Sequence, residues 1–231
     1  MSFEEITEKT YCPFAKPSKM GPGVTIRTDD VENELTQHRD IIADFFRTAA
    51  EQSLDGMIIT FEDTTLGSTL DALTDLTRRF YITLTRMFSS VYIPEDPRLD
   101  ERWYAMIEGE LFFLVSFAPC YPETSPRHTY GDQRIYFLLQ PASTFDRNAR
   151  SIDRKRAGIH RAFAAVGKPY DARLANVEND MFKAVMPIES LGDHIPWWVP
   201  DGGTAKEQQD RLLRRSSTAD SNHSTRELRR P

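Results

Sequence analysis

Two strongly apolar runs, at residues 111–118 and 135–139, stand out near the middle of the sequence. Both are rich in aromatic and β-branched side chains, a composition typical of strands buried on both faces near the middle of a sheet. The polar segment between them carries side chains capable of chemistry, and such side chains usually lie on loops that a rigid scaffold positions. The pattern therefore predicts that residues 103–147 form the centre around which the chain is organised.

Apolar residues at helical spacing predict two long helices before this centre. The first is expected over residues 31–54, with Asp30 as its N-cap. Residues 57–61 follow as a short apolar strand. Ser68 is expected to begin the second helix, because Asp71 three positions later completes a variant of the capping box.

Irregular segments and shorter helices are predicted towards both ends. Prolines and glycines interrupt residues 1–30, which we expect to be an irregular N-terminal arm. Helical spacing returns at residues 149–166, and a short helix is expected near residues 177–185. Residues 202–231 are rich in serine and arginine, and we expect them to be a basic, disordered tail.

Together these elements predict an α+β fold, with a central, mostly antiparallel sheet covered by helices. We expect one domain over residues 31–201, flanked by the N-terminal arm and the C-terminal tail. A chain of 231 residues is long enough for one domain with a sizeable core. Its 39% hydrophobic and 28% charged residues are ordinary for a globular protein.

Charge and cysteine content exclude several classes of protein. The net charge of −6 argues against a general nucleic-acid-binding protein. Two cysteines, Cys12 and Cys120, are too few for a disulfide framework, although they could form a single bridge. The sequence has no apolar run long enough for a membrane-spanning helix, and its acidic N-terminus lacks the apolar stretch of a secretory signal. We therefore expect a cytoplasmic protein without a membrane partner.

Motifs of the common nucleotide, zinc and hydrolase sites do not occur in the sequence. There is no G-x-G-x-x-G, no Walker A motif, no H-E-x-x-H, no C-x-x-C and no G-x-S-x-G. An enzyme that uses a nicotinamide cofactor or ATP therefore has no positive support.

The central segment carries a series of motifs that resembles a known family. In order they are W-x(5)-G-E-x-x-F, P-C-Y-P, S-P-R-H, F-x-L-Q-P and S-x-F-D-R. A Cys-Pro-Phe-Ala element at residues 12–15 and a weaker Met-Phe-Lys match at residues 181–183, followed by Pro187, extend the similarity over most of the chain. The set resembles the YqcI/YcgG family, and within it the guanitoxin-type N-hydroxylases. The matching central residues are Trp103, Gly109, Glu110, Phe113, Pro119, Cys120, Tyr121, Pro122, Ser125, Pro126, Arg127, His128, Phe137, Gln140, Pro141, Phe145, Asp146 and Arg147.

The resemblance implies a b-type heme protein. Characterised members hydroxylate a nitrogen of arginine or of a related guanidine with dioxygen, so a small guanidine or amine substrate is implied here. A reductase or a small electron carrier would supply the electrons. Many members carry Thr-Pro-Ala-His where this chain has residues 118–121, so a tyrosine, Tyr121, stands in the place of that histidine.

A heme needs an axial ligand, and the sequence leaves several candidates open. Of the five histidines, His128 lies inside the family-like motif beside Arg127, and it is the first candidate for the metal ligand. Cys120 and Cys12 are rivals, because a thiolate ligand favours O–O cleavage, and Tyr121 is a further alternative. His128 also has an ordinary structural explanation as a loop histidine bonded to backbone, and Cys12 as part of a small apolar anchor for the N-terminal arm.

The cofactor and the substrate would each need oppositely charged partners. Arg127, Arg134 and Arg147 could bind heme propionates as bidentate donors. The carboxylates that could pair with a guanidinium substrate are Glu108, Glu110, Glu123 and Asp132. The expected function is thus a heme-dependent monooxygenase acting on a guanidine or amine nitrogen. The alternatives are a non-catalytic heme- or small-ligand-binding protein and a purely structural domain.

Overall fold

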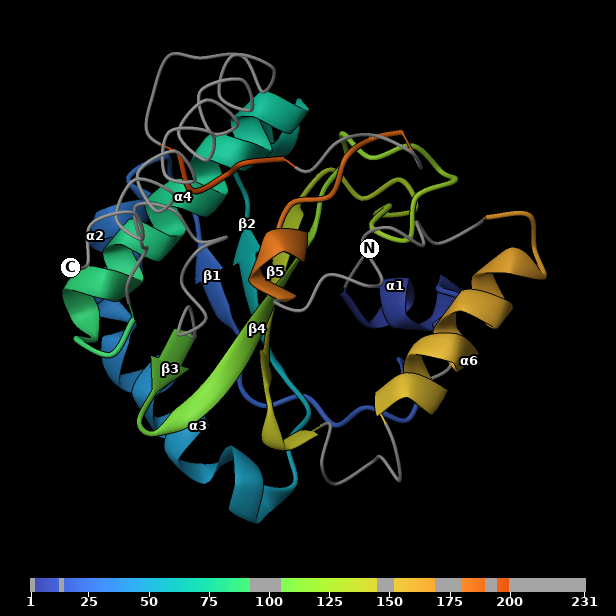
Figure 1. The fold of residues 1–231 in the computed structure, drawn as a ribbon. Coiled ribbons are helices and arrows are strands. Elements are labelled where there is room, and N and C mark those ends of the chain that lie inside the picture. Colours follow the sequence, from blue (N-terminus) through green and yellow to red (C-terminus); the bar gives the residue numbers. More distant parts are fainter. Residues whose placement is uncertain are drawn as a thin grey trace, which may run out of the picture.

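A computed structural model describes residues 3–12, 15–91, 105–144, 152–168, 180–189 and 195–199. These residues form an α+β fold in which one five-stranded, mostly antiparallel sheet is flanked by helices, as the sequence predicts (Figure 1). The helices are α1 (Phe3–Lys9), α2 (Val31–Gln37), α3 (Arg39–Gln52), α4 (Leu70–Met87) and α6 (Ile152–Ala164), with the 3-10 helices η1 (Thr64–Gly67) and η2 (Asp180–Lys183). The strands are β1 (Val24–Ile26), β2 (Met57–Phe61), β3 (Ala105–Ile107), β4 (Glu110–Phe117) and β5 (Ile135–Pro141).

The two apolar runs of the sequence are β4 and β5, which lie side by side. The strand order is β1-β2-β5-β4-β3, so β5 is the central strand. It pairs antiparallel with both neighbours, Phe137 facing Ile59 of β2 and Leu139 facing Leu114 of β4, whereas β1 is parallel to β2.

Burial differs between these two central strands. Most of β5 is buried, but β4 alternates between buried and half-buried side chains. The prediction that both runs are buried on both faces is therefore wrong for β4. Its second face carries Phe113, Val115 and Phe117, which are only half-buried, while neighbouring Tyr136 of β5 is buried.

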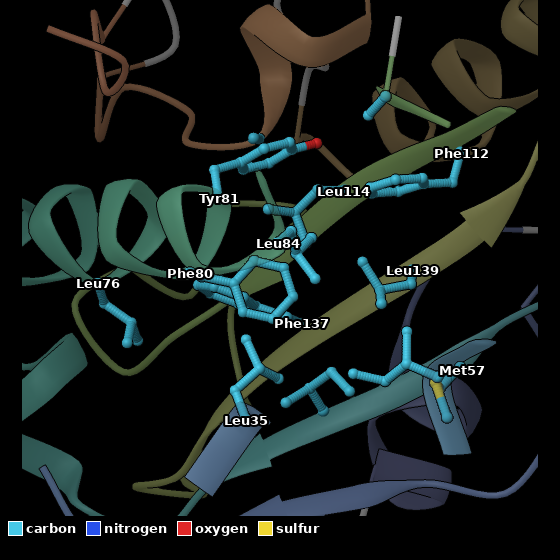
Figure 2. Packing of buried hydrophobic residues seen from close by; sticks show 14 of the residues in the cluster. Leu35, Met57, Leu76, Phe80, Tyr81, Leu84, Phe112, Leu114, Phe137 and Leu139 are labelled. Carbon is cyan, nitrogen blue, oxygen red and sulfur yellow. The ribbon is translucent and has the colours of Figure 1, made fainter. Parts of the chain in front are cut away.

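The main core lies between one face of the sheet and helices α2, α3 and α4. Alternate residues of β2, β4 and β5 point to this face, as the period of a strand requires. Phe80 of α4 lies edge-on to Phe137, with their ring centroids 5.2 Å apart (Figure 2). Tyr81 packs against Trp197, whose ring centroid is 4.7 Å away, so the late Trp197-Trp198 pair closes this core.

The opposite face of the sheet is covered by α1. Ile6 of α1 is 1% exposed and packs in a small cluster with Ile58 and Tyr136. Phe3 lies 5.5 Å from the ring of Phe117 and 5.6 Å from that of Tyr136. The described part of residues 1–30 is thus more regular than predicted, because it supplies both this helix and the edge strand β1.

The predicted helix over residues 31–54 is two helices that meet at His38. The backbone N–H of His38 bonds to the carbonyls of Leu35 and Thr36 and ends α2, and α3 then runs to a left-handed Ser53. Apolar spacing continues across the break, so the pattern could not reveal it. Asp30 caps α2 as predicted, accepting a hydrogen bond from the Asn33 N–H.

The later elements agree in part with their predictions. The N-cap of α4 is Thr69 and not Ser68; the Thr69 hydroxyl accepts the Ala72 N–H at 3.1 Å. The helix predicted over 149–166 is α6 in its described part, and the one predicted near 177–185 is the short η2. The predicted tail, residues 202–231, lies outside the described residues.

Candidate functional site

The loop between β4 and β5, residues 118–134, carries most of the predicted site residues. It lies beyond the end of β4, close to η2 and the segment that follows it (Figure 1). The Ala118 N–H bonds to the Arg127 carbonyl at 3.3 Å, and the Cys120 N–H bonds to the Gly67 carbonyl at 3.2 Å. The Thr129 hydroxyl donates to the Asp132 carbonyl at 2.6 Å. These bonds fix the loop at both of its ends and to η1.

A glycine at position 67 allows this attachment to η1. A Cβ atom there would lie 2.3 Å from a side-chain carbon of Ile135 and 3.3 Å from the Ala118 Cβ. No real side chain tolerates the shorter distance, so Gly67 lets η1 approach β5 closely. This contact positions the carbonyl that holds Cys120.

Arg127 points into the protein from this loop. Only 5% of the residue is exposed. Its Nε donates to the Met186 sulfur at 3.3 Å, and its guanidinium carbon lies 5.6 Å from the centre of the Phe117 ring. Its Nη1 is buried and has no hydrogen-bond partner.

Tyr121 lies near Arg127, and Cys120 precedes it on the same loop. Burial raises the pKa of the half-buried Cys120 thiol to about 11 and that of the fully buried Tyr121 hydroxyl to about 12. The Tyr121 oxygen accepts the Met186 N–H at 3.0 Å, and the charge of Arg127 opposes the rise in the Tyr121 pKa. Both side chains are therefore neutral near pH 7. Cys120, Tyr121 and Arg127 form one group, which we call the Arg127 cluster.

His128 is bonded within the loop itself. Its Nδ1 accepts the backbone N–H of Tyr130 at 3.2 Å, and the two rings lie 5.2 Å apart. Tyr130 has a positive φ of 54°, as does Gly131 at 96°, and this left-handed turn places the Tyr130 N–H against the imidazole. Partial burial lowers the pKa of His128. The imidazole is thus favoured in its neutral form, with its proton on Nε2.

Residues from both ends of the chain meet near His128. The charges of Glu123 and Lys168 act on its pKa in opposite directions. Lys168 Nζ donates to the Glu123 carbonyl at 2.8 Å and lies 5.2 Å from the centre of the Tyr11 ring. The loop, the end of α1 and the end of α6 are therefore joined at this point.

Arg134 is engaged elsewhere. Its guanidinium binds the Asp132 carboxylate through two bonds, Nε to Oδ1 at 3.1 Å and Nη2 to Oδ2 at 2.8 Å. The Tyr136 hydroxyl donates to the same carboxylate at 2.6 Å. Although burial opposes it, these bonds lower the pKa of Asp132. The charge of Arg134 is thus already balanced.

The remaining predicted ligands are only partly placed. Cys12 is half-buried, its backbone N–H bonds to the Thr10 hydroxyl, and no disulfide joins Cys12 to Cys120. His38 lies at the junction of α2 and α3, and His160 lies in α6. The predicted residues Trp103 and Arg147 lie outside the described part of the chain, as do the two other histidines, His194 and His223.

Three of the four candidate carboxylates have structural roles. Glu108 lies in the β3–β4 turn with φ of 51°, 3.8 Å from Arg47. Glu110 accepts the Ser143 N–H at 2.8 Å, and Asp132 is bound as described above. Glu123 is exposed on the loop and is the candidate best able to meet a cationic ligand.

One residue that contacts the Arg127 cluster was not anticipated from the sequence. Met186 contacts Arg127 through its sulfur and Tyr121 through its backbone, although it follows them by about sixty positions. A lone methionine has no chemical signature, so only its position beside Pro187 of the weak family-like match could have pointed to it.

Comparisons with known proteins add no information about this site, so its description rests on the geometry alone. No family model, curated protein or solved structure matches the chain. Within the described ranges, no group of three or more His, Cys, Asp or Glu side chains could hold a metal ion, and no helix is long and apolar enough to cross a membrane. A heme iron needs only one axial protein ligand. The absence of a group of three metal-binding side chains therefore concerns ions held by several side chains and not heme.

Proposed function

We propose that this chain is a cytoplasmic heme-dependent monooxygenase that hydroxylates a guanidine or amine nitrogen with dioxygen and electrons from a reductase or small carrier. The observation that carries the proposal is the Arg127 cluster. In it, one short loop holds a soft iron ligand, Cys120, next in the chain to Tyr121, whose hydroxyl feels the charge of a buried cation, Arg127, able to receive a carboxylate. The similarity of the same loop to the YqcI/YcgG motifs supports the assignment.

Cys120 is the donor that the geometry favours for the iron. Its thiol is half-buried on a loop fixed to Gly67, and no side chain in the described part of the chain forms a hydrogen bond with it. Because burial raises its pKa to about 11, the free protein keeps it as a thiol, and iron would have to displace the proton. A heme with a thiolate ligand supplies the oxygen activation that N-hydroxylation requires.

His128 remains a predicted iron ligand, but its hydrogen bonding would have to change before it could bind iron. A histidine that binds iron through Nε2 carries its proton on Nδ1. In the described geometry, Nδ1 accepts the Tyr130 N–H, so a proton there would face another proton. Coordination by His128 therefore requires the loss of this bond, whereas coordination by Cys120 does not.

The surrounding charges are suited to orienting a cofactor and a substrate. Of the two described candidate arginines for the propionates, Arg127 has a free donor while Arg134 is bound to Asp132. Glu123 is exposed beside His128 and could attract a guanidinium group from solvent. Tyr130, whose ring lies beside His128, could stack on that cation.

The first test is the visible absorption spectrum of the protein expressed with ample heme and then reduced under carbon monoxide. We expect a heme Soret band, and a reduced carbonyl band of the thiolate type, since Cys120 is the favoured ligand. Cys120→Ala should abolish the thiolate-type band. The matched variant Cys12→Ala should leave it unchanged, and His128→Ala should as well.

Other outcomes would change the assigned iron ligand or the proposed function. An imidazole-type band that His128→Ala removes would transfer the ligand role to His128. Bound heme without turnover of arginine or related guanidines would favour the non-catalytic heme-binding alternative. A folded protein that stays colourless and takes up no added heme would end the proposal.

A further inference from the structure

Only two charged side chains are buried in the described part of the chain, and their surroundings differ. They are Arg127, 5% exposed, and Asp132, 7% exposed. Asp132 has a full set of partners in Arg134 and Tyr136. Among the described residues, Arg127 has no carboxylate within ion-pair distance, and its Nη1 has no hydrogen-bond acceptor. Within the described residues, the buried anion is therefore compensated and the buried cation is not.

The neighbours of Arg127 cannot substitute for an anion. A guanidinium presents five N–H donors and remains protonated in proteins. The Met186 sulfur, a weak acceptor, takes only the Nε–H, and the Phe117 ring lies against the cation's face. The Tyr121 hydroxyl, which accepts the Met186 N–H, is neutral and cannot balance the charge of Arg127. Buried polar groups are nearly always satisfied, so an orphaned donor on a buried cation requires an explanation.

We infer that Arg127 is a binding site for one carboxylate, or an oxyanion of similar size, carried by a ligand. A carboxylate would accept hydrogen bonds from Nη1 and would also balance the charge, which a neutral ligand could not do. Because Nη1 is closed off from solvent, entry of the ligand has to displace a neighbouring side chain, and the flexible thioether of Met186 is suited to move.

The inference stands apart from the proposed catalysis, because the carboxylate could come from two sources. It could be a propionate of the heme, or it could belong to a free small ligand that binds whether or not heme is present. The shared chemistry is the carboxylate, and two experiments separate the sources.

The first experiment follows the melting temperature of the heme-free protein during titration with sodium propionate, against sodium chloride at equal ionic strength. We expect propionate to raise the melting temperature by roughly 3 °C or more once it exceeds its dissociation constant tenfold. In Arg127→Met the rise should vanish. Because this change removes an uncompensated buried charge, the variant should melt in chloride at or above the wild-type temperature.

Arg161→Met is the matched control, since Arg161 is exposed on α6, and it should respond to propionate as the wild type does. A wild type that responds equally to propionate and chloride would overturn the inference, and this result does not depend on any variant folding. An equal response in Arg127→Met would overturn it as well.

The second experiment compares uptake of hemin with uptake of hemin dimethyl ester, in which both propionates are blocked. If a propionate is the natural occupant, the wild type should bind hemin at least tenfold more tightly than the ester, and Arg127→Met should bind both alike. If a free ligand is the occupant, both forms should bind alike in the wild type. A response to propionate without uptake of either heme would sustain the anion site while ending the proposed heme function.

Discussion

At the scale of single residues, one hydrogen bond decides the form of His128. The imidazole can accept the Tyr130 N–H only while Nδ1 is unprotonated, and partial burial disfavours the charged ring further. Both effects lower the pKa of His128 in the folded protein relative to the unfolded chain. Protonation and the loop conformation are therefore linked.

The sign of this linkage predicts a loss of stability in mild acid. At pH values below the usual histidine pKa of 6.5, the unfolded chain binds a proton at this site more readily than the folded protein. Folding stability should therefore fall as the pH drops through this range and recover above it. We predict that His128→Asn, whose Oδ1 can still accept the Tyr130 N–H but does not titrate, loses about 1–2 °C less in melting temperature between pH 7.5 and 5.5. Equal losses in the two proteins would show that His128 is not the responsible group.

At the scale of secondary structure, the start of α4 offers a direct comparison of two adjacent residues. The Thr69 hydroxyl accepts the Ala72 N–H, whereas the Ser68 hydroxyl donates to the Thr65 carbonyl in η1. Thr69→Ala should thus cost about 1 kcal/mol of unfolding free energy, the usual value of an N-cap. Ser68→Ala should cost less than half of that. Urea denaturation of both variants measures the difference, and a larger cost at Ser68 would contradict the assigned cap.

These elements also indicate how far the sequence could predict the fold. The central strands and β2 are found from continuous apolar runs, and α4 is found from helical spacing, because both signals are local. The break at His38 is not, because no side chain caps α3 there and the apolar stripe continues through it. Asp71 made Ser68 resemble a cap, but the extended backbone of Thr69 gives that role to the next residue.

The site, like the fold, was predictable only where the signal is local in the sequence. The motif placed Cys120, Tyr121, Arg127 and His128 on one loop, which follows from their closeness in the chain. It could not indicate that Arg127 points inward to Met186 while His128 bonds to Tyr130. Directions of side chains depend on contacts between segments distant in sequence, and a pattern of residue types does not contain them.

At the scale of the whole molecule, α1 covers the second face of the sheet. Ile6 fills the space over Ile58 and Tyr136, so residues near the N-terminus contribute to the stability of strands more than fifty positions away. We predict that Ile6→Ala lowers the free energy of unfolding by roughly 2–4 kcal/mol. Glu8→Ala, at an exposed position of the same helix, should change it by less than about 0.5 kcal/mol. If Ile6→Ala melted at the same temperature as the wild type, the packing of α1 on the sheet would contribute little to stability.

The central place of β5 has a consequence for how the protein is made. Both of its neighbours, β2 and β4, precede it in the chain, so they leave the ribosome before the strand that must lie between them. Until residue 141 has emerged, each presents an open edge lined with unpaired backbone groups and apolar side chains. Nascent chains that end between residues 117 and 135 are therefore the ones most exposed to aggregation and most in need of a chaperone.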